Sequence, residues 1–392
     1  MLTHSLEFAP DRDEEIFAAI SSAPAVFLLR GENASAEPYI SKTSNLRRRL
    51  QRLLGTPTER TKRLNLRQQI RQIEYTVTGS DFESGFLLYK TLREIFPKKY
   101  AERMRFRFPP LVKLHLENSY PRASVTTRIG KLGGASVYYG PFPSRAFAEQ
   151  FASDSLDFFK MRRCVEDLHP NPQFPGCIYS EMKMCLAPCF KGCTDEEYAN
   201  EVSRVKNYFD SGGESLVREI SAARDSASAD LNFEAAATLH ARAEKLNTVV
   251  GWLPEIVRRI DHLDGVIVQP SVAPECVALF RLRSGFISSP ITFPIQSAEH
   301  AKSQSMESRI QARLAESPAE SPRTALEAME HLAMLKRWFF RSHRVGEIFL
   351  EDAHRELPMR RLVRGVARVY KGETPERSNS GLEAVPAKLQ DL

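Results

Sequence analysis

Five of the six cysteines of this 392-residue chain lie in one short segment, RRCVEDLHPNPQFPGCIYSEMKMCLAPCFKGC. Their spacing is Cys164-x12-Cys177-x7-Cys185-x3-Cys189-x3-Cys193. A zinc ribbon usually offers two CxxC knuckles, and this segment has none. Two distant and two close thiols, with a proline beside Cys189, suit an iron–sulfur cluster at least as well. Because thiolate sites for zinc and for iron look alike in a sequence, zinc and a metal-free segment stay open as alternatives.

The setting of these thiols also favours metal ligation. The chain begins with the acidic stretch MLTHSLEFAPDRDEEIF, which has neither the basic nor the apolar part of a secretory leader. No apolar run reaches the length of a membrane span. We therefore expect a cytoplasmic protein without membrane contact, in which thiols stay reduced and clustered cysteines indicate metal ligation more than disulfides. The sixth cysteine, Cys276, stands alone in an apolar run and is expected to be a core residue.

A second chemical feature is a basic segment near the N-terminus. The whole chain carries a formal net charge of only +6, but residues 42–71 hold ten Lys or Arg and a single acid, Glu59. Such a block repels itself unless it faces a polyanion or solvent, so it predicts either a nucleic-acid-binding surface or a solvated basic face. The residues expected to contact the nucleic acid are Arg47, Arg48, Arg52, Lys62, Arg63 and Arg67.

Length and composition predict a folded chain of two or three domains, since 42% of the residues are hydrophobic and 27% are charged. Apolar periodicity and turn residues predict an N-terminal unit with the order β-β-α-α-β-α. Its strands are expected at residues 25–30, 38–42 and 73–77, its helices at 44–54 and 81–96, and residues 56–70 as a basic connection leading into helix. Further strands are expected at 111–116, 123–127, 135–140, 264–270 and 277–287, and helices at 145–159, 195–250 and 299–341.

Six segments of the chain, taken in order, resemble one family. They are PAVF…PYISK…NLRRRL, DFESGFLLYKTLREIFPKKY, LVKLHLENSYPRASVT, VYYGPFPS, RRC…C…MCLAPC and LNFEAAATLHARAEKL. The first resembles the start of a GIY-YIG nuclease domain. Together they are similar to the UvrC excinuclease family of bacterial nucleotide excision repair. The resemblance covers residues 24–246, and the residues after about 300 show none.

The resemblance implies a phosphodiester-cleaving site in the N-terminal unit. Tyr39 would help to activate the attacking water, and Lys42 would support the site. Arg49 would neutralise charge on the scissile phosphate. A glutamate on the later helix would hold one Mg²⁺ or Mn²⁺ ion, which stabilises the leaving oxyanion.

Three positions depart from the pattern of the family. Phe27 stands for its first tyrosine, Ser41 for a glycine, and Tyr89 for the metal-binding glutamate. Glu83 and Glu94 lie about 120° and 140° around the helix from Tyr89, so neither shares its face. A phenol, with a pKa of about 10, binds a divalent ion poorly near neutral pH. The sequence therefore predicts either an impaired nuclease or a nuclease fold retained for holding DNA.

The resemblance has two further implications. The first is a [4Fe–4S] cluster on four of the cysteines, with Cys193 spare: Cys164, Cys177, Cys185 and Cys189. The second is a helical hairpin over about residues 215–250 that would meet a UvrB-like protein, although self-association through the same face is an alternative. Its partner contacts would be Phe233, Glu234, Ala236, Ala237 and Leu239.

These inferences predict an α/β (α+β) multidomain protein with a small GIY-YIG-type mixed sheet, a cysteine-rich metal region, a helical hairpin and a small C-terminal α+β region. The expected boundaries are 1–104 for the nuclease-like unit, 105–195 for the cysteine region, 196–255 for the helical region, 256–370 for an α+β remnant without RNase H or helix-hairpin-helix domains, and 371–392 for a disordered tail. The predicted function is that of a UvrC-like DNA-binding protein of nucleotide excision repair with an impaired active site. A catalytically inactive paralogue that binds DNA or a repair partner is the alternative, and a metal-stabilised RNA-binding protein is a third possibility.

Overall fold

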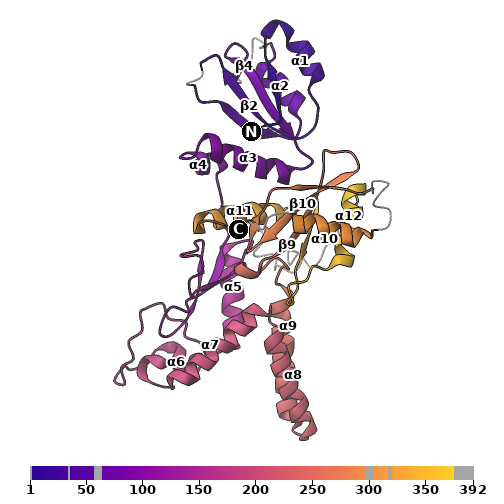
Figure 1. The fold of residues 1–392 in the computed structure, drawn as a ribbon. Coiled ribbons are helices and arrows are strands. Elements are labelled where there is room, and N and C mark those ends of the chain that lie inside the picture. The colour runs from indigo at the N-terminus through magenta and orange to yellow at the C-terminus, as the bar shows by residue number, and fades with distance from the viewer. Residues whose placement is uncertain are drawn as a thin grey trace.

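A computed structural model describes residues 2–33, 36–56, 64–296, 304–316, 320 and 322–374. This part of the chain is a mixed α/β structure with three small antiparallel sheets, each covered by helices (Figure 1). No helix within these residues is both long enough and apolar enough to cross a membrane. Of the tail predicted at 371–392, Lys371 is the last residue of the helix α12 (Met359–Lys371), and residues 375–392 lie outside the described residues.

The first sheet lies near the N-terminus and has the strand order β1-β4-β2-β3, so that β3 is an edge strand. Its strands are β1 (His4–Glu7), β2 (Ala25–Gly31), β3 (Tyr39–Thr43) and β4 (Ile70–Val77). The helices α1 (Asp13–Ala19) and α2 (Leu46–Leu54) cover one face, and α3 (Asp81–Ile95) lies along the other (Figure 1).

The strand β2 explains why this sheet is covered on both faces. Phe27 and Leu29 pack in one buried cluster with the leucines of α2. Val26 and Leu28 are also buried, and they alternate with the first pair along the strand, so they point to the α3 side. The chain enters α2 through Asn45, whose side chain accepts a hydrogen bond of 2.9 Å from the backbone N–H of Arg48. This is a common way to begin a helix.

The predicted strands and helices of this unit are confirmed, with three corrections. The helices α1 and α4 (Tyr100–Met104) were not predicted, because they are short and bury only one side chain between them, that of Phe17. The strand β1 was not predicted, because it is a short and mostly exposed edge strand with little apolar pattern. Helix was expected after the basic connection, whereas residues 64–69 form no helix and β4 begins at Ile70. Residues 57–63 lie outside the described residues.

The second sheet follows directly in the chain and has the order β6-β5-β7-β8. Its strands are β5 (Leu111–Leu114), β6 (Ala123–Thr126), β7 (Val137–Gly140) and β8 (Arg258–Arg259). It packs with α5 (Arg145–Leu156) and α7 (Asp195–Asp210) in the largest buried cluster. Between these helices the cysteine segment is irregular, as predicted, apart from the short α6 (Ile178–Glu181) and one 3-10 turn.

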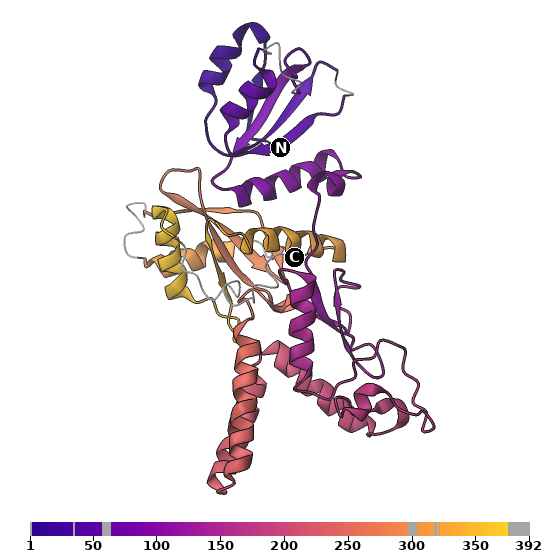
Figure 2. The same ribbon diagram turned by 180° about the vertical axis from the view of Figure 1, so that it is seen from behind.

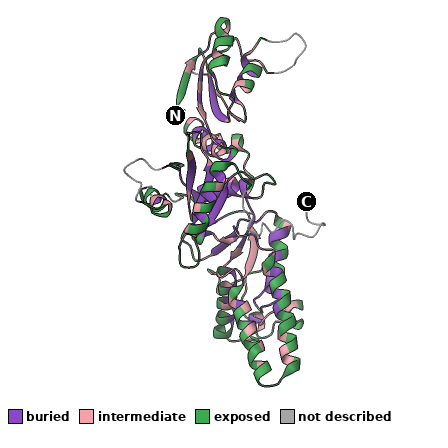
Figure 3. Cartoon of the chain, turned by 90° about the vertical axis from the view of Figure 1, so that its right-hand side faces the viewer, coloured by how far each residue is buried: buried purple, intermediate pink, exposed green. Residues whose placement is uncertain are grey.

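The helical hairpin is confirmed. Helix α8 (Glu214–Ala229) and helix α9 (Phe233–Gly251) lie side by side and project from the body of the molecule (Figures 1 and 2). Their tip is mostly exposed, and buried residues concentrate where the hairpin joins the rest of the chain (Figure 3).

The third sheet is built from the C-terminal third of the chain. Its strands are β9 (Gly265–Pro270), β10 (Cys276–Arg283), β11 (Phe286–Ile287), β12 (Ile291–Pro294) and β13 (Glu347–Leu350). Helix α11 (Ala325–Phe339) covers one face, while α10 (Met306–Glu316) and α12 (Met359–Lys371) cover the other. The strands β9 and β10 confirm the two predicted here, and Cys276 begins β10, where it is half-buried.

Helix α3 joins the first and third sheets. The rings of Phe82 and Phe86 contact the ring of Phe280 on β10, with centroids 5.1 and 5.9 Å apart. Phe82 also packs against Trp338 of α11 at 5.1 Å. The helix expected to complete the N-terminal unit therefore buries its aromatic face in the core of the C-terminal region.

Candidate functional site

Tyr39 and Arg49 meet on the α2 side of the first sheet. The guanidinium Nη2 of Arg49 donates a hydrogen bond of 2.9 Å to the Tyr39 hydroxyl. The ring of Phe27 lies tilted against that of Tyr39, with 6.0 Å between the centroids. Tyr39 and Arg49 are both half-buried, so a ligand can still reach them. A phenol beside a guanidinium can orient a phosphate and its attacking water, which is the role that the resemblance implies.

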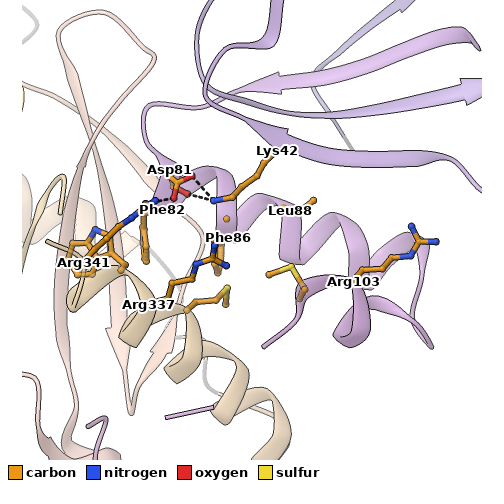
Figure 4. A pocket seen from close by; sticks show the side chains of 12 residues that line it. Lys42, Asp81, Phe82, Phe86, Leu88, Arg103, Arg337 and Arg341 are labelled. Atoms are coloured by element: carbon orange, nitrogen blue, oxygen red, sulfur yellow. Dashed lines mark hydrogen bonds and ion pairs between the residues drawn. The ribbon is translucent and has the colours of Figure 1, made fainter. Parts of the chain in front are cut away.

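Lys42 lies on the opposite face of the first sheet from Tyr39 and Arg49. It is three residues after Tyr39 on β3, and successive residues of a strand point to opposite faces, so it lies on the α3 side. Its Nζ lies 2.6 Å from Oδ1 of Asp81, the first residue of α3. Asp81 also pairs with Arg341, which follows α11, at 2.6 Å (Figure 4). The structure thus brings Tyr39 to Arg49 and separates Lys42 from both.

Asp81 is an acid that sequence reasoning missed. Burial alone would raise its pKa, but the ion pairs with Lys42 and Arg341 hold the pKa below its ordinary value. The two acids weighed as substitutes for a metal ligand were Glu83 and Glu94. Glu83 accepts a hydrogen bond of 2.7 Å from the backbone N–H of Gly79. Asp81 could have been noticed as a first-turn acid directly after the helix cap Ser80.

Tyr89 contacts neither the Tyr39–Arg49 pair nor the Lys42–Asp81–Arg341 ion pairs, and it lies in the interface with α11. Its hydroxyl donates a hydrogen bond of 2.6 Å to Glu330, and Tyr100 of α4 (Tyr100–Met104) donates one of 2.7 Å to the same carboxylate. Arg93 donates to the Tyr89 oxygen at 2.8 Å and pairs with Glu327. Burial, followed by the bond to Glu330, raises the pKa of Tyr89 far above its ordinary value, so it stays a neutral phenol.

The predicted DNA contacts divide into two kinds. Arg47 donates hydrogen bonds to the carbonyls of Ile20 (2.7 Å) and Ala18 (3.2 Å), and so ties α1 to α2. Arg67 pairs with Asp13 and donates to the carbonyl of Leu54 at 2.9 Å, which ties the chain before β4 to the same helices.

The other two described arginines remain available to a ligand. Arg48 and Arg52 are exposed and lie one turn apart on α2. Lys62 and Arg63 lie outside the described residues. The exposed pair Arg48 and Arg52, next to Arg49, is the basic surface that a nucleic-acid backbone could contact.

The structure gathers four of the cysteines into one group. Burial raises the pKa of Cys185 to about 11. The hydrogen bond from the Ala187 N–H lowers this pKa, and the nearby thiols of Cys164, Cys189 and Cys177 raise it further. The backbone N–H of Ala187 donates to the Cys185 sulfur at 3.3 Å. No group of three or more His, Cys, Asp or Glu in the described ranges is arranged to hold a metal ion. The four thiols therefore lie near one another without the geometry of a closed ligand set.

Cys193 stands apart from that group. Burial and then Glu197 and Asp195 raise the pKa of its thiol, and Cys189 acts on it more weakly. All six cysteines are free. The resemblance implies that Cys193 is the spare thiol, and that assignment stays a prediction.

A buried arginine lies against one of these sulfurs. Arg162 is only 2% exposed. Its Nη1 lies 3.4 Å from the Cys164 sulfur and donates to the carbonyl of Glu166 at 2.8 Å, while its Nε donates to the carbonyl of Tyr120 at 2.9 Å. Across the described residues no carboxylate pairs with it. Because a buried cation without an anion is costly, a thiolate at Cys164 would complete this site. The four thiols and the buried cation thus have the chemistry, though not the closed geometry, of a metal centre bound by thiolates.

The chain is similar in sequence to proteins of one family. Residues 110–208, from β5 to α7 and including the cysteine segment, match the family described as UvrC/Cho excinuclease, middle domain. The chain is a relative of the UvrC family.

The matches to UvrC proteins extend over most of this chain but over less than half of each relative. The UvrABC system protein C of Aliivibrio fischeri is 27% identical over 285 residues, which is 71% of this chain and 45% of that protein. Its counterpart in Idiomarina loihiensis is 27% identical over 60% of this chain and 39% of its own length. The one in Rickettsia bellii is 26% identical over 63% and 38%. The chain thus spans less than half the length of the curated relatives it matches. No solved structure matches it significantly.

The hairpin of this UvrC relative leaves its predicted contact residues accessible. Phe233 is 67% exposed, and Leu231 in the turn before it is 73% exposed. Glu234 and Ala237 are exposed and Ala236 is half-buried, whereas Leu239 packs partly against the main core. Large apolar side chains at an exposed tip are what a binding surface requires.

The third sheet holds a carboxylate pair that sequence reasoning did not identify. Asp264 before β9 and Glu351 after β13 are both buried, and Arg283 lies between them at 3.2 and 3.4 Å. No spacing in the sequence of this UvrC relative reveals the pair, because the two acids meet only when β9 and β13 pair. Arg283 compensates one of the two negative charges, and burial raises the pKa of Glu351.

Proposed function

We propose that this chain is a UvrC-like DNA-binding protein of nucleotide excision repair in the cytoplasm. The observation that carries the proposal is the Tyr39–Arg49 hydrogen bond beside the exposed Arg48 and Arg52, in a relative of the UvrC family. The cations would contact the DNA backbone, and Tyr39 would lie against the phosphate that Arg49 neutralises.

For the chemistry of this site we propose an excinuclease of GIY-YIG type whose active site is impaired. Mg²⁺ or Mn²⁺ would stabilise the leaving oxyanion in an active site of this kind. The described residues do not fit such an ion. Tyr89 donates its hydroxyl to Glu330, and Asp81 is held by two cations on the other face of β3.

The same observations favour the second candidate, a catalytically inactive paralogue. A side chain that would serve as a metal ligand is instead part of the contact between α3 and α11. In this form the N-terminal sheet holds DNA, and the hairpin tip around Phe233 brings in a UvrB-like protein or a second copy of the chain.

For the cysteine segment we propose a [4Fe–4S] cluster on Cys164, Cys177, Cys185 and Cys189, with zinc as the alternative. The mutual proximity of the thiols and the buried Arg162 support it. A bound cluster would fix a loop that has little regular structure, because ligation free energy becomes folding free energy.

The deciding experiment is a nicking assay on supercoiled and damage-containing DNA with Mg²⁺ or Mn²⁺, using protein purified without oxygen. Tyr39→Phe and Arg49→Ala serve as the matched variants. Nicking by the native chain that both variants lose would establish a working nuclease. Firm, salt-dependent DNA binding without nicking would establish the DNA-holding paralogue. Preference for RNA over duplex DNA at equal salt would exclude both.

A further inference from the structure

We propose that a pocket between the first sheet and α11 binds a single nucleotide through its phosphate. The pocket has a volume of about 200 Å³ and forms where β3, α3, α4 and α11 meet (Figure 4). It lies on the α3 side of β3, opposite the Tyr39–Arg49 pair, so it is a second site rather than part of the first.

The charge in the pocket selects an anion. Lys42, Arg337 and Arg341 line it, and Asp81 is the only carboxylate among its lining residues, so three positive and one negative side chain leave a net charge of +2. A fourth cation, Arg103, turns its guanidinium to Glu37 at 2.7 Å. Its charge is therefore already compensated outside the pocket.

Arg337 is the cation left over for a ligand. Lys42 and Arg341 are both held by Asp81 at 2.6 Å. Arg337 makes no ion pair with any described residue, and its side chain extends toward Phe86 in the middle of the pocket (Figure 4). A guanidinium presents two parallel N–H donors that match two oxygens of a phosphate.

The remaining wall of the pocket is apolar and indicates what else the ligand carries. It is formed by Phe82, Phe86, Leu88, Met104, Met334 and Trp338. An inorganic anion would gain nothing from such a wall, whereas a nucleobase would bury a flat apolar face against it. The two methionines can adapt to the outline of a base because their side chains are unbranched and flexible. A phosphate with a base attached satisfies both halves of the pocket.

Ion pairs and hydrogen bonds connect the two walls of the pocket. Asp81 links β3 to the end of α11 through its two ion pairs. Two to three turns further along α3, Tyr89 and Arg93 bind Glu330 and Glu327 of α11. These contacts hold the two walls at a set distance, so binding would not have to supply that ordering free energy.

The nucleotide can come from two sources. Because β3 is an edge strand, a nucleic-acid strand that passes its edge could contact Arg49 on one face and place a nucleotide in the pocket on the other. In that form the inference rests on the proposed DNA binding. A free mononucleotide would bind by the same chemistry without it.

The test uses the full chain and its own fluorescence. The chain has two tryptophans, Trp252 and Trp338, so Trp252→Phe leaves the pocket residue Trp338 as the reporter. We expect dAMP and a short oligo-dA to quench Trp338, and inorganic phosphate to compete. Arg337→Gln should raise the Kd for dAMP about tenfold. The matched control Arg360→Gln, an exposed arginine on α12, should leave the Kd unchanged.

Circular dichroism and thermal unfolding would show that each variant is folded. No quenching by millimolar dAMP would overturn the inference, as would quenching that Arg337→Gln leaves unchanged. The double variant Arg48→Gln/Arg52→Gln separates the two proposals. Loss of duplex binding with dAMP binding retained supports both sites, and a wild type that binds dAMP but no duplex rejects only the DNA-binding function. Quenching lost in the double variant but kept in Arg337→Gln places the nucleotide on α2 and rejects the pocket.

Discussion

The hydroxyl of Tyr89 on α3 donates a hydrogen bond of 2.6 Å to Glu330 on α11, a carboxylate that is only 1% exposed. Tyr100 supplies a second donor to the same group at 2.7 Å. A buried carboxylate needs such donors because it has lost its water. The position that the resemblance to nucleases gives to a metal ligand is therefore occupied by a residue that stabilises the contact between the N-terminal sheet and the C-terminal region.

Tyr89→Phe should destabilise the fold. The variant keeps the ring but leaves the buried Glu330 with one donor fewer, which typically costs about 1–3 kcal/mol. Urea unfolding followed by circular dichroism would measure the change in the free energy of unfolding. Tyr100→Phe is the matched control and should cost less, because Tyr100 is only half-buried and water can replace its hydroxyl. Equal stability of Tyr89→Phe and the native chain would contradict the account.

Tyr89→Glu should fail to restore a nuclease. It would place a second carboxylate beside the buried Glu330, and the repulsion and lost hydrogen bond should lower the free energy of unfolding by several kcal/mol. Thermal unfolding and Mg²⁺-dependent nicking of the same preparation would check both parts. A stable variant that nicks DNA would show that Tyr89 does face the Tyr39–Arg49 pair in solution.

Arg48→Gln/Arg52→Gln should weaken duplex DNA binding without affecting the fold. Each lost phosphate contact should reduce the slope of log Kd against log salt by about 0.9, so the pair should lower it by roughly 1.8. Fluorescence anisotropy at several salt concentrations gives the slope. Arg67→Gln is the contrasting variant, since Arg67 pairs with Asp13 inside the fold and should lower the melting temperature instead. An unchanged slope in the double variant would remove α2 from the DNA surface.

Cysteine variants should sort the thiols into ligands and a spare. Cys185→Ser, in the middle of the thiol group, should lose most of the bound metal, whereas Cys193→Ser should retain it. Iron, sulfide and zinc content together with visible absorbance distinguish a cluster from zinc. Equal metal loss in both variants would mean that Cys193 is a ligand, and a native chain without metal would remove the proposed centre.

Arg162→Gln should weaken metal retention while leaving all four thiols in place. The substitution removes the buried positive charge 3.4 Å from the Cys164 sulfur, so thiolates there become less favourable. The measurement is metal content after a timed chelator challenge. Arg163→Gln is the neighbouring control, because Arg163 pairs with Asp157 instead of a cysteine. Equal retention in the two variants would show that Arg162 has only a structural role.

His331 should make stability depend on pH below 6.5. Burial lowers its pKa to about 3, and its Nδ1 accepts the backbone N–H of Ile287 at 3.0 Å. Above pH 6.5 the residue is neutral in both states. As the pH falls from 6.5 toward 3, only the unfolded chain takes up the proton, so stability is lost by up to about 1.4 kcal/mol per pH unit.

The measurement for His331 is urea unfolding between pH 5 and 7, above the range where most carboxylates titrate. His331→Asn keeps an acceptor for the Ile287 N–H. It should reduce the number of protons taken up on unfolding, given by the slope of the free energy of unfolding against pH, by about one. His343→Asn, on the exposed turn after α11, controls for the loss of a histidine. A steep dependence that survives His331→Asn would assign it to another group.

The elements themselves could largely be predicted from local pattern. The leucine spacing of α2, the apolar run of β2 and the hairpin of α8 and α9 all follow from which residues can be buried at helical or strand spacing. β1 was missed because an exposed strand of four residues has no such pattern and forms only when β4 offers its edge. The prediction of a helix after the basic connection was wrong, because the chain there turns directly into β4.

The sequence predicted which candidate residues lie close together, but it did not predict all of their partners. The spacing of the cysteines and of Tyr39 and Arg49 depends on one or two adjacent elements, and the structure brings those residues together. By contrast, Arg47 and Arg67 looked like DNA contacts because charge is visible in a sequence and its partners are not. Their partners are backbone carbonyls up to 57 residues away and an acid 54 residues away.

The thiol group, the hairpin and the basic helix could be predicted from the sequence because each depends on residues close together in the chain, and the family relationship because each of its motifs does. The roles of Lys42, Asp81 and Tyr89 depend instead on how distant elements pack. Strand alternation sends Lys42 to the opposite face from Tyr39, and the packing of α3 on α11 brings Tyr89 to Glu330, which is 241 residues away. Contacts at that distance follow from how buried faces fit together, and no local pattern of residue types encodes them.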